Sequence, residues 1–423
     1  MAIIQVKSSN PNFSFVIRKN PATGMLLREI RKGLGYGWFS DDNTYNVYFK
    51  DADNDVSYKR NKDEKFEYLN TTRYNSPLAV LNMINEYFDT AMKKRSEQDT
   101  YGEGITNTFY VPMVNVVHPR YIKFFQDNYS DFQLEAQQVA SKSYSITITT
   151  KRTVHDLLNY VSLLMLFFAI FAEEYVDLSD SLIAKYIKVI NALDSPFYIR
   201  YLFGRNILNT RERFGKYKAE LEATKRNTID LKFGNTAIQR RDKIKSMLKY
   251  DKSILDIGCG EGFYAVPFSR NIPEHFYYAV DVDDEMVKIV EQKAKKAQIE
   301  NLVAYHSIES FLENYSEEKV DIILTEVVEH MELEEAFRLL QMIVNNIDFE
   351  KLIVTTPNAS FNRYYSLEET FRHDDHKWEM KEEEFRTWVQ SIFGLRWHIE
   401  FFGIGDSVDG IHTTQGVIIK KGS

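Results

Sequence analysis

Residues 253–262 read SILDIGCGEG, in which an apolar run typical of a β-strand leads into three alternating glycines. Glycine permits a tight backbone turn and a close approach to a ligand, so the stretch predicts a ligand-binding loop between a strand and a helix. A dinucleotide-binding loop of the G-x-G-x-x-G type would need its third glycine near position 263, where this chain has Phe263. The spacing therefore favours a different ligand.

The chain around this loop alternates strand-like and helical patterns. Such alternation predicts an α/β fold with a doubly wound, mainly parallel sheet and helices on both faces. We expect a helix over residues 237–248 and strands over residues 253–257, 277–282, 303–306, 320–324 and 352–355.

With its leading acidic residue, the loop resembles motif I of the class I S-adenosylmethionine-dependent methyltransferases. The resemblance implies a Rossmann-like fold and S-adenosylmethionine as the cofactor, with its amino-acid end held by the loop. About twenty residues on, Asp281 ends the next strand, where a carboxylate can accept both ribose hydroxyls. A glycine turn beside an incidental acidic residue is the alternative interpretation. The residues expected at the cofactor are Asp256, Gly258, Gly260, Asp281, Ser307, Ile308 and Thr325.

A second polar group follows a later strand, where the sequence reads TEVVEHM. Glu326, Glu329 and His330 are spaced i, i+3 and i+4, so a helical turn would place all three on one face. His373 and His376 lie on the loop after a neighbouring strand. Carboxylates and imidazoles together suit Mn²⁺, Co²⁺ or Fe²⁺ more naturally than Mg²⁺, so the group predicts a metal site. A solvated, acid-rich helix start and a surface histidine loop are the alternatives.

Together with DIGCGEG, the segments EVVEHM, TTPNASFN, RHDDHKWEM and TTQGVIIK resemble the 3′-terminal RNA ribose 2′-O-methyltransferase family over residues 227–423. Bacterial members of that family serve RNA repair, and eukaryotic members protect small RNAs. The chain departs from the family at Trp378-Glu379-Met380, where Phe-Glu-Trp is usual, which affects how the terminal base would be held. The resemblance implies catalytic roles for Glu326, Glu329, His330, His373 and His376, all but His373 as metal ligands, and we expect RNA contacts at Asn358 and Arg372.

The resemblance also implies the reaction. A divalent ion, Mn²⁺ or Mg²⁺, would bind the 2′ and 3′ hydroxyls of the terminal ribose together, which explains why only a free 3′ end is accepted. The ion would lower the pKa of the 2′ hydroxyl, which would attack the sulfonium methyl in line. His330 and His373 are both candidates for the general base, and the sequence does not separate them.

The first half of the chain has a weaker pattern, and we expect it to form an α+β subdomain at residues 1–95 and a second subdomain, strands then helices, at residues 96–226. The methyltransferase domain would occupy residues 227–423. In bacterial members of the family the N-terminal half contacts and activates an RNA ligase in a complex with a polynucleotide kinase-phosphatase, and the resemblance implies these partners here. The elements expected are strands at 13–18, 45–49 and 144–149, a helix from Ser76-Pro77, a linker or mobile loop at 93–104, and helices at 153–172, 178–193 and 205–223.

Composition and charge restrict which ligands, cysteine sites and cellular locations are expected. The formal net charge of −8 gives no chain-wide attraction for nucleic acid, so any RNA contact must be local. A single cysteine, Cys259, excludes an internal disulfide framework and a cysteine-based zinc site. The apolar run at 160–172 is shorter than the roughly 20 residues that cross a bilayer, and the N-terminus lacks a secretory signal. We therefore expect a cytoplasmic protein without membrane contact.

Two other functions stay open at this point. The chain could act chiefly as a structural subunit that activates a ligase, with methylation secondary. It could also methylate a small molecule, its acidic and histidine residues being clustered by accident. Ligation rates measured with a metal-site variant test the first, and chelator-insensitive activity without RNA would favour the second.

Overall fold

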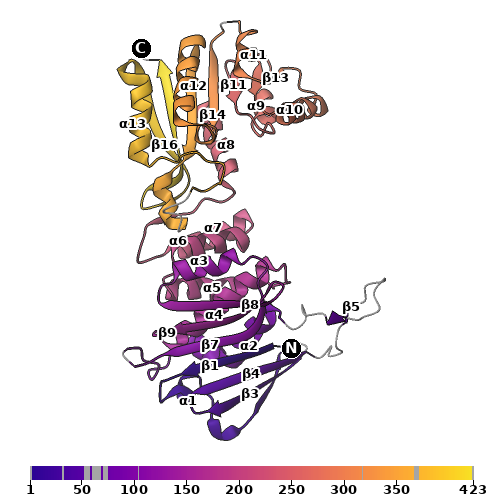
Figure 1. Ribbon diagram of the computed structural model, residues 1–423, viewed down its shortest axis with the longest axis vertical. Coiled ribbons are helices and arrows are strands. Elements are labelled where there is room, and N and C mark those ends of the chain that lie inside the picture. The colour runs from indigo at the N-terminus through magenta and orange to yellow at the C-terminus, as the bar shows by residue number, and fades with distance from the viewer. Residues whose placement is uncertain are drawn as a thin grey trace. The chain divides into compact units, whose positions relative to one another are not determined.

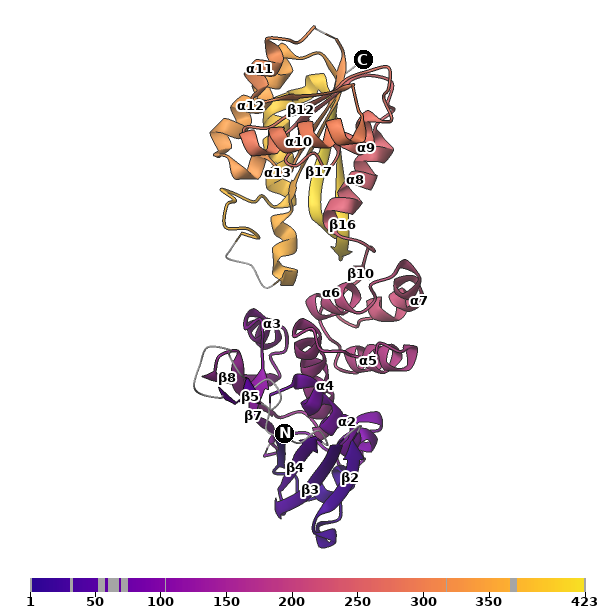
Figure 2. The same ribbon diagram turned by 90° about the vertical axis from the view of Figure 1, so that its right-hand side faces the viewer.

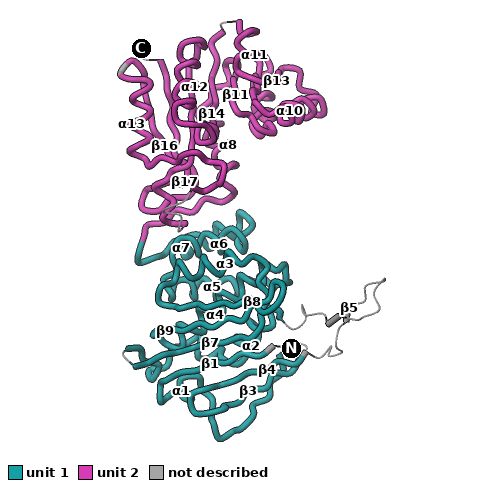
Figure 3. Tube along the Cα trace, in the orientation of Figure 1, with its two compact units in different colours: residues 1–226 teal, residues 227–423 magenta. Residues whose placement is uncertain are grey.

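The structure is a computed structural model of the 423-residue chain. It describes residues 2–30, 33–51, 58–59, 68–69, 75–102, 104–316, 318–365 and 371–421. The chain divides into two compact units, Met1–Arg226 and Asn227–Ser423, which Figure 3 colours separately. Each unit has its own large β-sheet.

The first unit is built on an antiparallel sheet (Figure 1). Its strands are β1 (Ala2–Ser8), β2 (Leu26–Ile30), β3 (Gly33–Asp41), β4 (Thr44–Asp51), β7 (Asn107–Asn115), β8 (Phe132–Ala140) and β9 (Ser143–Thr150), and β5 (Tyr58–Lys59) pairs separately with β6 (Tyr68–Leu69). The seven strands lie in the order β2-β3-β4-β1-β7-β9-β8. Because β1 pairs with both β4 and β7, the subdomain division expected between residues 95 and 96 crosses a continuous sheet.

The helices of this unit follow their capping signals. They are α1 (Phe13–Val16), η1 (Pro21–Thr23), α2 (Pro77–Lys93), α3 (Arg120–Asn128), α4 (Val154–Phe171), α5 (Asp180–Ala192), α6 (Phe197–Asn206) and α7 (Arg211–Glu222). The hydroxyl of Ser76 accepts the Ala79 N–H, and Pro77 occupies the first helical position, so α2 begins where the sequence predicts.

Two elements expected in the first unit differ from those observed. Residues 13–16 form the short helix α1 and not a strand, because Phe13 and Val16, three residues apart, are both buried on one side of a helical turn. The helix expected at 205–223 begins later, as α7, because Thr210 accepts the Arg213 N–H and starts the helix there, and residues 205–206 belong to the preceding helix α6, which was not predicted.

The most apolar helix, α4, forms the core of the first unit. It is long and apolar enough to cross a membrane by length and composition, but 78% of it is buried inside the protein. It packs against α2 and α5 and against the sheet strands β7 and β9. The burial makes α4 a core helix, within the span of residues 153–172 that the sequence predicts to be helical.

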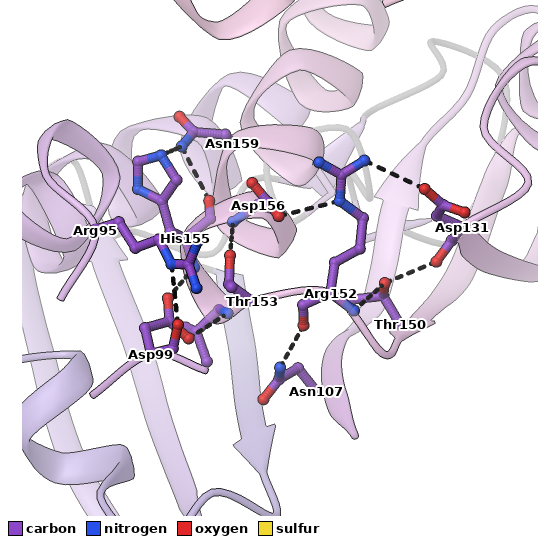
Figure 4. Close-up of polar contacts among 11 residues, drawn as sticks. Arg95, Asp99, Asn107, Asp131, Thr150, Arg152, Thr153, His155, Asp156 and Asn159 are labelled. Atoms are coloured by element: carbon purple, nitrogen blue, oxygen red, sulfur yellow. Dashed lines mark hydrogen bonds and ion pairs between the residues drawn. The ribbon is translucent and has the colours of Figure 1, made fainter. Parts of the chain in front are cut away.

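The segment at residues 93–104, expected to be a linker or mobile loop, is fastened to α4. Asp99 is 1% exposed, and its carboxylate accepts the backbone N–H groups of Val154 and His155 at 2.9 and 2.8 Å (Figure 4). Burial raises the pKa of Asp99. A buried carboxylate at the first turn of a helix satisfies N–H groups that have no partner within the helix, so this contact holds the segment in place.

The second unit has an eight-stranded mixed sheet. Its strands are β10 (Ile229–Asp230), β11 (Ile254–Ile257), β12 (Tyr277–Val280), β13 (Leu302–Tyr305), β14 (Val320–Thr325), β15 (Phe349–Pro357), β16 (Trp397–Val408) and β17 (Ile411–Lys421). The order is β10-β16-β17-β15-β14-β11-β12-β13. The strands from β15 to β13 are parallel, and β17, β16 and β10 join in antiparallel fashion.

Helices cover both faces of this sheet, as expected for a doubly wound fold. They are α8 (Thr236–Met247), α9 (Ala265–Ser269), α10 (Asp284–Ala297), α11 (Ile308–Leu312), η3 (Val328–His330), α12 (Leu333–Asn346), η4 (Ala359–Tyr365), α13 (Glu382–Phe393) and η5 (Gly394–Arg396). One apolar core joins α11, α12 and α13 to the sheet, and another joins α8, α9 and α10. The parallel strands bring the loops that follow β11, β12, β13, β14 and β15 to one edge.

Candidate cofactor and metal site

The glycine loop after β11 is shaped for a ligand at one position. Gly258, Gly260 and Gly262 all have positive φ, at +72°, +51° and +73°. A Cβ on Gly258 would lie 2.3 Å from the Val327 side chain, whereas a Cβ on Gly260 would meet open space. The Gly260 N–H donates to Asp281 at 2.7 Å. Gly258 is therefore required by packing, and Gly260 leaves room for a bound molecule.

Asp256, expected at the cofactor, lies inside the sheet. It is 1% exposed, and its carboxylate accepts the Tyr277 hydroxyl at 2.7 Å. Burial raises its pKa to about 7, with the nearby Asp281 carboxylate adding to the rise. Asp256 thus supports the loop from within the domain.

The residues predicted for the ribose and the adenine of the cofactor follow β12. Asp281 accepts the N–H groups of Gly260 and Asp283, so its carboxylate is fixed at the end of β12. Val282, which the sequence analysis missed, is 90% exposed beside it. An apolar side chain left open next to a carboxylate that is predicted to bind ribose fits an aromatic base, and only the exposure of this valine in the fold reveals it.

The remaining predicted cofactor residues serve the loops around this space. The Ser307 hydroxyl accepts the Ser310 N–H in a capping box at the start of α11. Ile308 is 8% exposed within the apolar core, and Thr325 is 7% exposed at the end of β14. Their side chains are largely buried, so contact with a cofactor at these positions would be mainly through the backbone.

Three of the four predicted metal ligands come together. One ligand atom from each of Glu329, His330 and His376 lies within 4.8 Å of the other two. Glu329 and His376 are buried and His330 is exposed. The residues after β14 form a 3₁₀ turn, η3, in place of the helical turn that the spacing suggested. One carboxylate and two imidazoles make a donor set suited to a transition-metal ion.

Glu329 carries the clearest sign of an absent partner. Its side chain is fully buried, and one carboxylate oxygen accepts the Thr356 hydroxyl at 3.2 Å. The other oxygen has no hydrogen-bond partner. Burial raises the pKa of Glu329, and the nearby Glu326 carboxylate raises it further. A buried carboxylate oxygen without a partner is costly unless a cation occupies the space beside it.

Glu326, the fourth predicted ligand, is bound elsewhere. Its backbone is left-handed, with φ +54°, and its carboxylate lies 2.9 Å from the Arg240 guanidinium. It also accepts the Thr355 hydroxyl at 3.1 Å. Arg240 on α8 was not predicted for the site, because nothing in the local sequence links it to a residue 86 positions away, the difference between 326 and 240.

Carboxylates fix the two imidazoles of the group. Nδ1 of His376 lies 2.7 Å from Glu379, whose side chain is 1% exposed, and Nδ1 of His330 lies 3.1 Å from Asp375. A carboxylate on one ring nitrogen orients the imidazole and leaves the other nitrogen for an ion. The family departure at Trp378-Glu379-Met380 thus retains the glutamate that holds His376.

Three further predicted site residues, His373, Arg372 and Asn358, differ in their exposure and contacts. His373 is exposed, and its ring centre lies 5.1 Å from that of His376. Arg372 donates from each of its three guanidinium nitrogens to a protein oxygen, on Asn362, Thr413 and Asn358. Asn358 is itself 2% exposed. Arg372 and Asn358 therefore hold the loop together, which accounts for them without RNA.

The two parts of the site are in contact. Val327, which lies between Glu326 and Glu329, packs where a Cβ of Gly258 would otherwise be. The glycine loop and the turn that carries Glu329 and His330 therefore lie at one edge of the sheet, as expected for the carboxyl ends of parallel strands.

Comparison with known proteins places this arrangement in a family. A family model described as the Hen1 N-terminal domain matches residues 3–226, which is more than half of the chain. The chain belongs to the Hen1 family. A methyltransferase domain model matches residues 254–348, and the second unit has the class I S-adenosylmethionine-dependent methyltransferase fold. The family and fold expected from the sequence motifs are confirmed.

Two curated relatives of this Hen1-family chain are small RNA 2′-O-methyltransferases. The one from Tetrahymena thermophila is 28% identical over 185 residues, covering 39% of this chain and 42% of the relative. The one from Schizosaccharomyces pombe is 26% identical over 205 residues, covering 41% and 54%. The chain thus spans about half the length of the curated relatives that it matches.

Solved structures match the whole chain. One, described as the structure of the Pnkp1/Rnl/Hen1 RNA repair complex, is 26% identical with a TM-score of 0.77 and covers 99% of this chain and 100% of the other. A second, described as the structure of the Pnkp1/Rnl/Hen1 complex, is 24% identical with a TM-score of 0.76 and the same coverage. The second of these shows the fold alone.

Proposed function

We propose that the chain transfers a methyl group from S-adenosylmethionine to the 2′ hydroxyl of the 3′-terminal ribose of RNA, with a divalent ion bound at the site. The observation that carries the proposal is the group of Glu329, His330 and His376 in contact, through Val327, with the glycine loop. The open space at Gly260 and the exposed Val282 support S-adenosylmethionine as the donor.

The chain's own residues would position the reactants. Glu329 and the imidazoles of His330 and His376 would hold the ion, while Glu379 and Asp375 keep those imidazoles oriented. When bound, the ion lowers the pKa of a hydroxyl that it contacts, and S-adenosylmethionine supplies a methyl group on a sulfonium. Aligning the hydroxyl oxygen with that methyl group is the further contribution of the fold.

We assign the proton acceptor to His373. Of the two candidates, His330 belongs to the metal-binding group, and its imidazole would have both nitrogens engaged by the ion and Asp375. His373 lies beside the group and is exposed. His373→Ala should lower kcat about 10²- to 10⁴-fold while Mn²⁺ stays bound, measured by methyl transfer and metal analysis in parallel. An unchanged kcat would rule this assignment out.

The substrate class is tested with three RNA ends. Labelled methyl transfer should occur to RNA with 2′ and 3′ hydroxyls and fail with RNA that ends in a 2′-deoxyribose or a 3′-phosphate. Equal labelling of all three would contradict the proposal. Activity that persists with a chelator and without RNA would favour a small-molecule methyltransferase.

We also propose that the first unit binds and activates an RNA ligase in a cytoplasmic repair complex that includes a polynucleotide kinase-phosphatase. The support is the match along 99% of this chain to a chain in the structure of the Pnkp1/Rnl/Hen1 RNA repair complex, together with the Hen1 N-terminal domain model that matches residues 3–226. Ligation by a cognate ligase should rise when the chain is added, and should rise equally with a Glu329→Gln chain. A chain that fails to copurify with ligase and leaves its rate unchanged would end this part of the proposal.

A further inference from the structure

Helix α8 is a basic helix in an acidic protein. It carries four basic side chains, on Arg240, Arg241, Lys243 and Lys245, and one acidic side chain, on Asp242, whereas the whole chain has a formal net charge of −8. Ile244 is the buried residue of this helix. Little of α8 packs into the core, so most of its basic side chains are not used in packing.

The basic surface begins at the candidate site. Arg240 forms the 2.9 Å ion pair with Glu326, and Arg241 lies over the ring of Phe263, 4.9 Å from its centre, just after the glycine loop. Further along the helix, Lys243 lies 5.9 Å from the ring centre of Phe402 on β16, against which α8 packs (Figure 2). Positive charge therefore extends from the site along the helix.

The outer charges of α8 have few acidic partners among the described residues. Lys243 and Lys245 are exposed and form no ion pair with the described residues, and Arg241 has only a 3.8 Å contact with its neighbour Asp242. Arg241 and Lys245 are four residues apart, so they share one side of the helix and are separated by about 6 Å along its axis. Cations spaced in this way suit successive phosphates of one nucleic-acid strand.

We propose that α8 binds the backbone phosphates of the RNA strand whose 3′ end enters the candidate site. The inference rests on the proposed function, because it takes RNA as the substrate, and it deepens that function by naming the surface. Basic side chains interleaved with aromatic rings, here Phe263 and Phe402, are typical of surfaces that bind single strands. Phosphate contacts carry no sequence information, so α8 sets the affinity for the strand and not the choice of sequence.

The test measures RNA binding apart from catalysis. The full chain is titrated with a labelled single-stranded RNA that ends in a 3′-phosphate, without metal or S-adenosylmethionine, at several salt concentrations. The Arg241→Ala/Lys245→Ala chain should bind about tenfold more weakly, and its plot of log affinity against log salt should be shallower by about 0.7 for each lost phosphate contact. The Arg241→Lys/Lys245→Arg chain should bind as the unchanged protein does.

The matched control removes the same charge elsewhere. Lys295→Ala/Lys296→Ala, at exposed positions on α10, should leave affinity and salt slope unchanged. Equal binding by the α8 and α10 variants would overturn the proposal. So would methylation of RNA with a free 3′ end by a chain that shows no binding to 3′-phosphate RNA, and that result would leave the proposed function intact. Binding through α8 with no methylation of any RNA end would instead refute the proposed function alone.

Discussion

Glu329 is the residue at which the chemistry of the site concentrates. Its side chain has no exposed surface, and one of its oxygens has no partner within the protein. Burial and the nearby Glu326 charge both raise the pKa of Glu329, so they favour its neutral form until a cation arrives. Binding of an ion would therefore release a proton at this residue.

Replacing the Glu329 carboxylate should weaken metal binding without lowering the stability of the protein. Glu329→Gln should weaken Mn²⁺ binding by more than about 100-fold, which is beyond the loss expected for an outer hydrogen-bond partner of a ligand. The metal-free variant should melt no lower than the unchanged protein, because the amide is neutral at every pH and close in size to the carboxyl group that it replaces. Calorimetric titration with Mn²⁺ and a thermal melt check both, with Glu334→Gln on the exposed face of α12 as the control. Unchanged Mn²⁺ affinity would remove Glu329 from the ligand set.

Asp256 predicts a pH dependence of stability. Burial raises its pKa from 3.8 to about 7 in the folded protein, so the folded state binds the proton more tightly than the unfolded state does. Stability from the protonated form is complete below the unfolded pKa and is lost as the pH rises through the folded pKa, by about 4 kcal/mol at most. Asp256→Asn should therefore flatten the fall in melting temperature between pH 5 and pH 8, measured without metal. A fall as steep as that of the unchanged chain would contradict this account.

At the scale of elements, the glycine loop and the turn after β14 fit against each other at one point. Gly258→Ala should destabilise the second unit by about 2–4 kcal/mol, since a left-handed alanine and a contact of 2.3 Å with Val327 both add cost. Adding Val327→Ala should recover the packing part of this loss. Gly260→Ala should cost about 1–2 kcal/mol for its backbone alone and abolish S-adenosylmethionine binding. Melting temperatures and cofactor titration give the comparison, and equal destabilisation by both alanines would refute it.

Sequence patterns predict these elements well where the information is local. The strands at the glycine loop, the start of α2 at Ser76 and the histidine loop all follow from residues within one turn or one strand. Contacts between distant residues escaped prediction, which is why Glu326 was grouped with Glu329 although Arg240 holds it. The contacts of Arg372 with Asn358 and Thr413 were missed for the same reason, since these residues become neighbours only in the fold, and its contact with RNA stays a prediction.

At the scale of the whole molecule, two units with separate sheets should respond separately to ligands. We expect two transitions in scanning calorimetry of the full chain. S-adenosylmethionine with Mn²⁺ should raise only the transition of residues 227–423, by about 2.7 kcal/mol of stabilisation when the ligand is at 100 times its Kd. A cognate ligase should raise the other transition. A single transition that shifts as a whole with either ligand would show that the units unfold together.

The contact of Val327 with Gly258 should couple the binding of the methyl donor to the binding of the ion. Because a side chain of the turn proposed to bind the ion occupies the space left by the missing Cβ, neither segment can shift without displacing the other. Occupancy of one subsite would then alter the affinity of the other, and thermodynamic reciprocity makes the two effects equal. Titrating the methyl donor with and without Mn²⁺, in the unchanged chain and in Val327→Ala, would measure how much of that cooperativity passes through one valine.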